Sequence, residues 1–471
     1  MRLLRRLVLL SFAFPIALAA QGRAPDPRQP IDWLALEREG LTLLRDYLRV
    51  NSTNPPGNEL EAARFLRDFL AKQGIEARIL DTAELGAGRA NLYARIEGDG
   101  SKRAIALVHH MDVVPATAST WSVPPFSGTL RDGFVYGRGA LDMKSEGIAQ
   151  LLAVVALKRG GVPLTRDLVI IANADEEAGS TGALTFADKH ADLVRDVEFL
   201  FTEGGSNSVR NDTLRFRGIG VSEKRTFWQR LTVRGTPSHG SRPTKDNPVP
   251  RLVAALDRLA RYETPLHVTP GVDRYFRDIS RDHPGERGRW LQNVSKALED
   301  PRAREWILSD LYWNAILRNT ISLTGLQGSN KTNVIPPEAS AELDIRLLPD
   351  QNPDSMLATL KAVVADTAVK FTPLIVPKAP FESATNTAFF RALERVSRER
   401  DPGAFVTSTM LTGATDRPMY RGLGIQVYGV DPFRNNDVDN LRGVHGNDER
   451  ISVASFLSGI HYLYDLLRYV Q

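Results

Sequence analysis

Two periodicities of apolar and polar positions alternate along the first half of the chain. Apolar side chains recur at helical spacing in residues 33–50, 58–73 and 145–159. Short apolar runs indicate strands at ANLYARI (90–96), AIALVHH (104–110) and DLVIIANAD (167–175). Alternating strands and helices predict an α/β layered sheet, with the chemically active groups at the ends of its strands.

The pattern changes after about residue 221. Strand signals at RTFWQRLTVRG, ISLTGLQG and SAELDIRLLP surround a helix at about 247–262 and a polar, Trp-containing stretch that extends to about 318. A helix at 387–400 then restores the first pattern. We therefore predict one larger domain in two parts, 31–221 and 376–471, with a smaller α+β unit inserted at 222–375.

Composition indicates a globular protein and argues against nucleic acid as the partner. The chain is 42% hydrophobic and 25% charged, and its length of 471 residues is enough for two or more domains. Lys and Arg total 60 against 56 Asp and Glu, and they are spread without basic blocks that interleave with aromatics.

The first twenty residues have the pattern of a secretory signal peptide. A cationic start, MRLLRR, precedes the apolar run LVLLSFAFPIALAA, in which Ala17 and Ala19 fit a small-residue cleavage site. This predicts a periplasmic or secreted protein, with an uncleaved membrane anchor as the alternative. Cys is absent, so neither disulfides nor a lipid-modified Cys can form.

Three adjacent acids, Asp175, Glu176 and Glu177, follow the strand VIIANA directly. Neighbouring carboxylates repel one another, and burying them without a cation costs roughly several kcal/mol. The group is therefore either a solvated turn or is neutralised by a metal ion. The local residues leave both possibilities open.

Other candidate ligands also follow strands or lie in Gly-containing loops. The segment AIALVHHMD ends with His110 and Asp112, whose side chains would share one face of a strand. The His could be a metal ligand that the carboxylate orients, or it could be structural. Asp142 precedes a helix and could be either a metal ligand or the cap of that helix. Glu203 ends the apolar segment EFLFTE, and His445 lies in the loop RGVHGNDERIS. Two His with several acids suit zinc or a similar divalent ion.

Five ordered motifs, HHMDVVP, GRGALDMKS, DEEAGS, TEGG and VHGNDERI, make the sequence recognisable. They resemble the co-catalytic dizinc metallopeptidase family that includes aminoacylase, carboxypeptidase G, succinyl-diaminopimelate desuccinylase and carboxypeptidase S. The resemblance covers residues 35–470. It implies a zinc-peptidase-like mixed α/β sheet covered by helices, with an inserted α+β lid or dimerisation domain.

The resemblance also implies a ligand set for two zinc ions per subunit, with cobalt or manganese as substitutes. His110 and Glu203 would bind one ion, Glu177 and His445 the other, and Asp142 would bridge them.

Neighbouring acids would then have different roles. Asp112 would orient His110, and Asp175 would end the strand structurally. Glu176 would be the general base that takes a proton from water and gives it to the leaving amine, which requires a pKa raised toward neutrality.

The inserted unit carries further resemblances. GTPSHGSRP resembles a lid motif in which His239 would donate to the substrate oxyanion, commonly across a homodimer interface; the local alternative is a surface-loop His. TNVIP with Asn333 and LDIRLLP with Arg346 resemble segments that line the substrate cleft, as does LTGATDRP with Gly413 and Asp416. Arg346 could pair with a substrate carboxylate or serve as a structural ion-pair partner.

The sequence departs from the family pattern at two places. TEGG stands where many relatives have Asp-Glu-Gly-Gly, so Glu203 is the remaining acid there. Asn447 and Asp448 precede Glu449 where relatives usually have His-x-x-Asn-Glu, which leaves the hydrogen bonding of that loop open.

These features predict a dizinc hydrolase that cleaves an amide or peptide bond of a dipeptide, small peptide or N-acyl amino acid. Pocket shape decides between carboxypeptidase, dipeptidase and aminoacylase activity. One alternative is a binding protein that has lost catalysis, against which the intact Glu176 argues. A related dizinc aminopeptidase is the other, against which the inserted SHGSRP unit argues.

Overall fold

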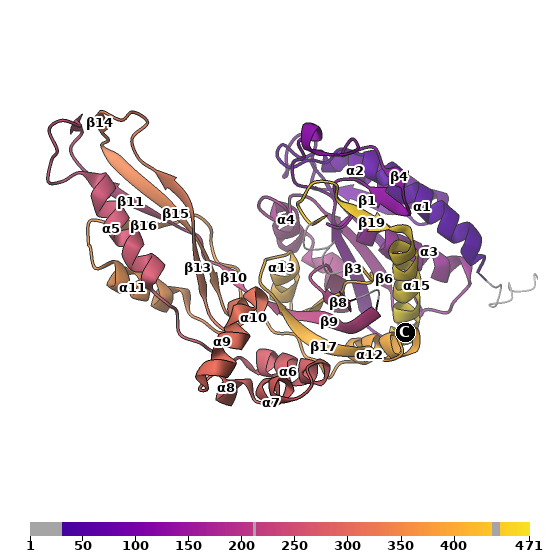
Figure 1. Cartoon of the computed structure of the whole chain (residues 1–471). Coiled ribbons are helices and arrows are strands. Elements are labelled where there is room, and N and C mark those ends of the chain that lie inside the picture. Colours follow the sequence, from indigo (N-terminus) through magenta and orange to yellow (C-terminus); the bar gives the residue numbers. More distant parts are fainter. Residues whose placement is uncertain (1–30, 211–212, 436–442) are drawn as a thin grey trace, which may run out of the picture.

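A nine-stranded mixed sheet forms the centre of the computed structural model, which describes residues 31–210, 213–435 and 443–471 (Figure 1). Its order is β1-β2-β6-β3-β7-β18-β9-β17, with β8 beside β9. The strands are β1 (Ala77–Leu80), β2 (Asn91–Ile96), β3 (Ala104–His110), β6 (Leu168–Asn173), β7 (Val197–Thr202), β8 (Ser206–Arg210), β9 (Thr213–Glu223), β17 (Phe405–Leu411) and β18 (Gln426–Gly429). Because β6, β3, β7 and β18 are parallel, their carboxyl ends meet at one edge.

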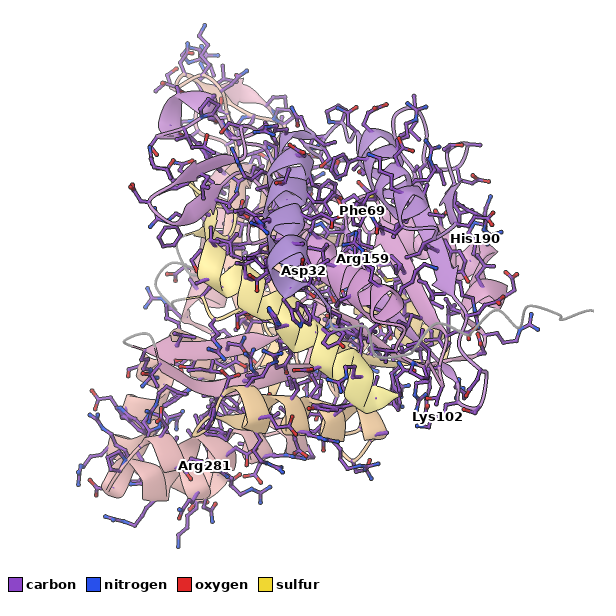
Figure 2. All side chains as sticks on the ribbon, turned by 90° about the vertical axis from the view of Figure 1, so that its right-hand side faces the viewer. Asp32, Phe69, Lys102, Arg159, His190 and Arg281 are labelled. Atoms are coloured by element: carbon purple, nitrogen blue, oxygen red, sulfur yellow. The ribbon has the colours of Figure 1, made fainter. Side chains whose placement is uncertain are left out.

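Helices cover both faces of this sheet, as the predicted layered α/β class requires. One face packs against α1 (Trp33–Arg49), α2 (Glu59–Lys72), α3 (Lys144–Arg159), α12 (Ala388–Arg400) and α15 (Val453–Val470). The other packs against α4 (Thr181–Lys189) and α13 (Arg417–Gly422). Figure 2 shows α15 lying across α1, which starts after Asp32, and α3, which ends at Arg159.

Alternation along β3 explains why the strand is apolar throughout. Ile105 and Leu107 belong to the core on the α1 and α3 side, whereas Ala106 and Val108 belong to the core on the α4 side. A strand buried on both faces reads as a continuous apolar run.

A second, five-stranded sheet stands apart from the first in Figure 1, and we call it the lid sheet. Its strands are β10 (Arg225–Thr226), β11 (Gln229–Arg234), β13 (Thr320–Gln327), β15 (Glu338–Leu347) and β16 (Lys370–Pro373). The helices α5 (Pro248–Arg261) and α11 (Pro353–Val364) pack on one face, and they lie on the side away from the nine-stranded sheet. At the far tip, β12 (Ser238–His239) pairs with β14 (Val334–Ile335).

Short helices occupy most of the stretch that the sequence pattern left as polar and Trp-containing. They are α6 (Pro270–Ile279), α7 (Glu286–Gln292), α8 (Val294–Ala297), α9 (Pro301–Ser309) and α10 (Leu311–Ile316). Their core includes Phe276 and Trp313 together with Phe216 of β9 and Met410 of β17. This part of the middle range therefore shares a core with the larger sheet, and the domain boundaries stay a prediction.

A small sheet of β4 (Thr129–Arg131), β5 (Phe134–Tyr136) and β19 (Arg450–Ser452) lies beside the larger one. The described residues also include 3-10 turns, namely η1 (Ala118–Thr120), η2 (Ala191–Val194) and η3 (Ser280–Asp282). Among the described helices, none combines the length and the apolarity needed to cross a membrane. The predicted signal peptide lies outside the described residues.

Candidate active site

Candidate ligands gather at the edge where the parallel strands end. His110 is the last residue of β3, the pair Glu176 and Glu177 follows β6, and Glu203 follows β7. Asp142 reaches the same place from the segment just before α3. Strand ends that are adjacent in the sheet thus bring together residues far apart in sequence.

Asp142 lies between the two histidines. Its Oδ1 is 2.9 Å from Nε2 of His110, and its Oδ2 is 3.2 Å from Nε2 of His445. Glu177 Oε2 is 3.1 Å from His445 Nε2, and Glu203 Oε1 is 3.9 Å from His110 Nε2. The carboxylate therefore offers one oxygen to each of two clusters, as a bridging ligand would.

These side chains fit a pair of divalent cations. Ligand atoms of His110, Asp142 and Glu177 lie within 4.8 Å of one another, as do those of His110, Glu176 and Glu203. Glu177 Oε1 is buried without a hydrogen-bond partner in the described part of the chain. Imidazole and carboxylate groups are the ligands of catalytic zinc sites.

The buried acids and histidines of this cluster shift one another's pKa values. Burial and the neighbouring Glu203 raise the pKa of the Glu176 carboxyl well above its ordinary value. Burial and Asp142 do the same to the pKa of Glu203. The carboxylates of Asp142 and Glu177 raise the pKa of His445 to about 10. Carboxylates crowded in this way retain protons that a metal ion would displace.

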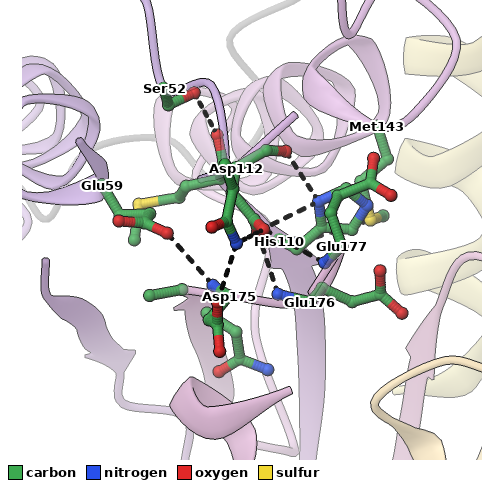
Figure 3. Close-up of polar contacts among 12 residues, drawn as sticks. Ser52, Glu59, His110, Asp112, Met143, Asp175, Glu176 and Glu177 are labelled. Atoms are coloured by element: carbon green, nitrogen blue, oxygen red, sulfur yellow. Dashed lines mark hydrogen bonds and ion pairs between the residues drawn. The ribbon is translucent and has the colours of Figure 1, made fainter. Parts of the chain in front are cut away.

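Asp112 fixes the backbone that carries the acid pair (Figure 3). Its carboxylate accepts hydrogen bonds from the amides of Glu176 and Glu177, both at 3.1 Å. Nδ1 of His110 is 3.0 Å from the backbone carbonyl of Asp112 and 3.6 Å from its carboxylate. In this structure the backbone carbonyl is thus the nearer group to the imidazole, and the carboxylate holds the loop.

Asp175 lies outside the ligand cluster, two residues past the end of β6. It has a left-handed φ of 63°, forms an ion pair with Arg89 and accepts a 2.6 Å hydrogen bond from Thr181 Oγ1. Nδ2 of Asn54 bridges the two acids, at 2.7 Å from Asp175 and 2.8 Å from Asp112. Sequence reasoning missed Asn54 and Arg89, because neither carries a ligand-type group or a spacing signal.

Comparison with known proteins supplies the family. The model of peptidase family M20/M25/M40 matches residues 106–469. The chain belongs to this family. Human N-fatty-acyl-amino acid synthase/hydrolase PM20D1 is 30% identical over 389 residues, which cover 80% of this chain and 76% of the human protein.

Two solved structures share the M20 fold. The M20 family metallo-carboxypeptidase Sso-CP2 from Sulfolobus solfataricus has a TM-score of 0.72 at 20% identity, covering 92% of this chain and 99% of that one. Human carnosine dipeptidase 1 has a TM-score of 0.68 at 17% identity, covering 94% and 99%. The predicted family, the zinc-peptidase-like α/β fold and the class of metallopeptidase or amidohydrolase are confirmed.

Glu449, just before β19, organises the loop that presents Asp142. It accepts hydrogen bonds from the amides of Gly139 at 2.9 Å, Leu141 at 2.7 Å and Asp142 at 3.1 Å. Its other partner is the buried guanidinium of Arg138 at 2.7 Å. Glu449 is thus a positioning residue for the central carboxylate.

The two residues that depart from the M20 pattern have other partners. Asn447 Oδ1 accepts a 3.1 Å hydrogen bond from Thr120, and Asp448 Oδ1 accepts a 2.7 Å bond from the amide of Ser122. Their changed order therefore leaves the contacts of Glu449 intact.

Two of the predicted lid residues lie together at the far tip of the lid sheet. His239 on β12 is exposed, with Nδ1 2.8 Å from Ser241 Oγ and Nε2 3.5 Å from Asn333 Nδ2. The tip lies far from the end of β3 in Figure 1. Within one chain in this conformation, the structure does not bring His239 or Asn333 to the ligand cluster.

The remaining cleft candidates are closer to the nine-stranded sheet. Arg346 on β15 forms a two-pronged ion pair with Asp344, at 2.7 and 3.1 Å. Gly413 lies in the loop after β17. Asp416 is buried and accepts a 2.8 Å hydrogen bond from Asn173, the last residue of β6. Their substrate-binding roles stay predictions.

Proposed function

We propose that this M20 enzyme hydrolyses the amide bond of N-acyl amino acids or small peptides that end in a free carboxylate. Two zinc ions would be held by His110 and Glu203 and by His445 and Glu177, with Asp142 between them. The observation that carries the proposal is Asp142, whose two oxygens face the two histidines at 2.9 and 3.2 Å.

Glu176 is the proposed general base. When bound, the two ions would polarise the amide carbonyl and lower the pKa of a water molecule. Glu176 lies beside His110 and Glu203 and is not needed to bridge the histidines. Its raised pKa suits a carboxyl that accepts a proton from water and then delivers it to the leaving amine nitrogen.

The choice of substrate class rests on chemistry that the relatives share. The human relative is an N-fatty-acyl-amino acid synthase/hydrolase, and the two similar structures are a carboxypeptidase and a dipeptidase. Each of these names implies an amide next to a carboxylate-bearing amino acid. Arg346 is the proposed partner of that carboxylate, because a guanidinium matches carboxylate geometry.

We also propose that two copies associate through the lid sheet and that the protein is exported. β13 pairs only with β15 among the described strands, and its Leu323 and Leu326 are exposed. An exposed apolar edge strand is a template for pairing with another chain. Such a dimer would let His239 reach the partner's site, and the MRLLRR-led N-terminus supports periplasmic or secreted localisation.

Metal analysis combined with a substrate screen tests the proposed function. Zinc-loaded protein should hold about two ions per chain and hydrolyse N-acyl amino acids or dipeptides, with activity lost to chelator and restored by zinc. His110→Ala and His445→Ala should lose both metal and activity. Absence of bound metal after zinc reconstitution would remove the mechanism.

A further inference from the structure

The two faces of the lid sheet differ in chemistry. Alternate residues of β11 and β15, such as Leu231, Leu343 and Ile345, are buried against α5 and α11. The opposite face carries mainly polar side chains, including the exposed ion pair of Arg230 and Glu342. This polar face is the one turned toward the nine-stranded sheet in Figure 1.

Trp228 and Leu374 depart from this rule. Trp228 is 36% exposed and Leu374 is 39% exposed, although both are large apolar side chains. The amide of Leu374 donates to the carbonyl of Trp228 at 3.0 Å. Because the next pair, Gln229 and Pro373, is in register, the two residues lie opposite each other and their side chains share the polar face.

A cation lies beside this apolar pair. The Arg346 guanidinium is 5.6 Å from the centre of the Trp228 ring. Asp344 engages two of its N–H groups, and Thr226 Oγ1 accepts a third at 3.1 Å. A guanidinium has five N–H donors, so two remain for a ligand, counted over the described residues.

Trp228 also lies close in sequence to the nine-stranded sheet. Glu223, the last residue of β9, accepts a 2.8 Å hydrogen bond from Thr415 in the loop that leads to Asp416. Four residues lie between Glu223 and Trp228, so their Cα atoms are at most about 18 Å apart. Trp228 is therefore one short chain segment away from the loop that carries Asp416, whose partner Asn173 ends β6.

We propose that Trp228 and Leu374 bind the side chain of the carboxylate-bearing amino acid of the substrate, and that they select large apolar side chains. This inference rests on the proposed function. The carboxylate and the side chain of this amino acid are bonded to the same Cα. A substrate carboxylate that pairs with Arg346 would therefore place the substrate side chain next to the Trp228 ring. The acyl group lies across the scissile amide and belongs at the metal ligands.

Binding of free amino acids to zinc-loaded protein tests this inference apart from turnover. By calorimetry, wild type should bind L-phenylalanine more tightly than glycine. Trp228→Ala should lose roughly ten- to a hundredfold of that preference, the range set by apolar contacts in binding pockets. Trp228→Phe should retain most of it. Val253→Ala, which removes an exposed apolar side chain on α5, should leave it unchanged.

Turnover then separates the inference from the proposed function. Among N-acetyl amino acids, Trp228→Ala should lower kcat/KM for the phenylalanine substrate and spare the glycine substrate, and Leu374→Ser should act in the same direction. A preference that survives both substitutions would overturn the inference. So would an effect on acyl-chain length instead of on the amino acid. A wild type that binds phenylalanine selectively but cleaves no amide would refute the proposed function alone.

Discussion

The carboxyl edge of the nine-stranded sheet and the tip of the lid sheet each carry a histidine predicted to act in catalysis, but their surroundings differ. His110 is 2% exposed and lies among Asp112, Asp142 and Glu203. His239 is exposed and contacts only Ser241 and Asn333 by side-chain hydrogen bonds among the described residues. Buried polar groups need partners within the fold, so the first site is assembled by folding. If His239 acts in catalysis, another surface has to bring a substrate to it.

The largest effect should separate the two neighbouring acids of the buried site. Glu176→Gln should lower kcat by about 10²- to 10⁴-fold, the usual contribution of a general base, while two zinc ions stay bound. Glu177→Gln should lose zinc, because Glu177 reaches His445 at 3.1 Å. Elemental analysis beside steady-state kinetics distinguishes them. Equal metal loss in both variants would mean that the roles are assigned wrongly.

The lid tip should show the next largest effect. If His239 donates to the developing oxyanion, His239→Ala should lower kcat by about 10²- to 10³-fold, with KM and metal content little changed. A buried ligand such as His110 would instead lose metal when changed.

Mixing two inactive variants decides whether His239 acts across a dimer. Some mixed dimers of His239→Ala and Glu176→Gln chains would hold one complete site, so activity should reappear. No recovery from any mixture would place both residues in the same subunit's site. Sedimentation that finds a monomer at assay concentration would contradict the exchange between subunits.

The structure brings the predicted ligand candidates His110, Asp142, Glu177, Glu203 and His445 together, whereas the sequence did not point to the residues that support them. His110 could be found because it ends an apolar strand, Glu203 because it directly follows one, and Glu177 because it lies in an acidic run just after one. Asn54, in contrast, reaches Asp112 and Asp175 only after folding, and its local sequence shows a turn. Contacts between residues 58 and 121 positions apart leave no local pattern.

The helices from α6 to α10 escaped prediction for a different reason. They are short, and each buries only a few side chains, such as Phe276 and Trp313, so no long apolar periodicity develops. The sequence also could not predict how far His239 lies from the candidate metal ligands, because that distance depends on where the lid sheet lies relative to the nine-stranded sheet.

A smaller effect should come from the support of Asp142. Glu449→Gln keeps the size of the side chain but removes the charge that pairs with Arg138 and holds three amides. Zinc affinity should fall by about 10- to 100-fold, as for other groups that orient ligands. Chelator competition measures this. Asp448→Asn is the matched control, and an equal loss of affinity there would contradict the role of Glu449.

The smallest effect should come from Asn54, whose amide joins the two acids behind the catalytic pair. In Asn54→Ala, Asp112 keeps the amides of Glu176 and Glu177, and Asp175 keeps Arg89, so neither carboxylate is left without a partner. The link between the two carboxylates is lost, together with the 2.7 Å hydrogen bond that Arg89 donates to Asn54 Oδ1. A hydrogen bond to a charged group is worth about 1.5–3 kcal/mol, and shared support reduces that, so kcat should fall by roughly tenfold with zinc content unchanged.

Asn58→Ala, which removes a weaker 3.3 Å side-chain contact to Asn51, is the control for Asn54. Asn54→Asp should be worse than Asn54→Ala, because it places a third carboxylate between two others and like charges repel. If Asn54→Asp retained full activity, the bridge would not be what positions Glu176. The amide bonds from Asp112 would then suffice to hold the acid pair in the buried half of the site.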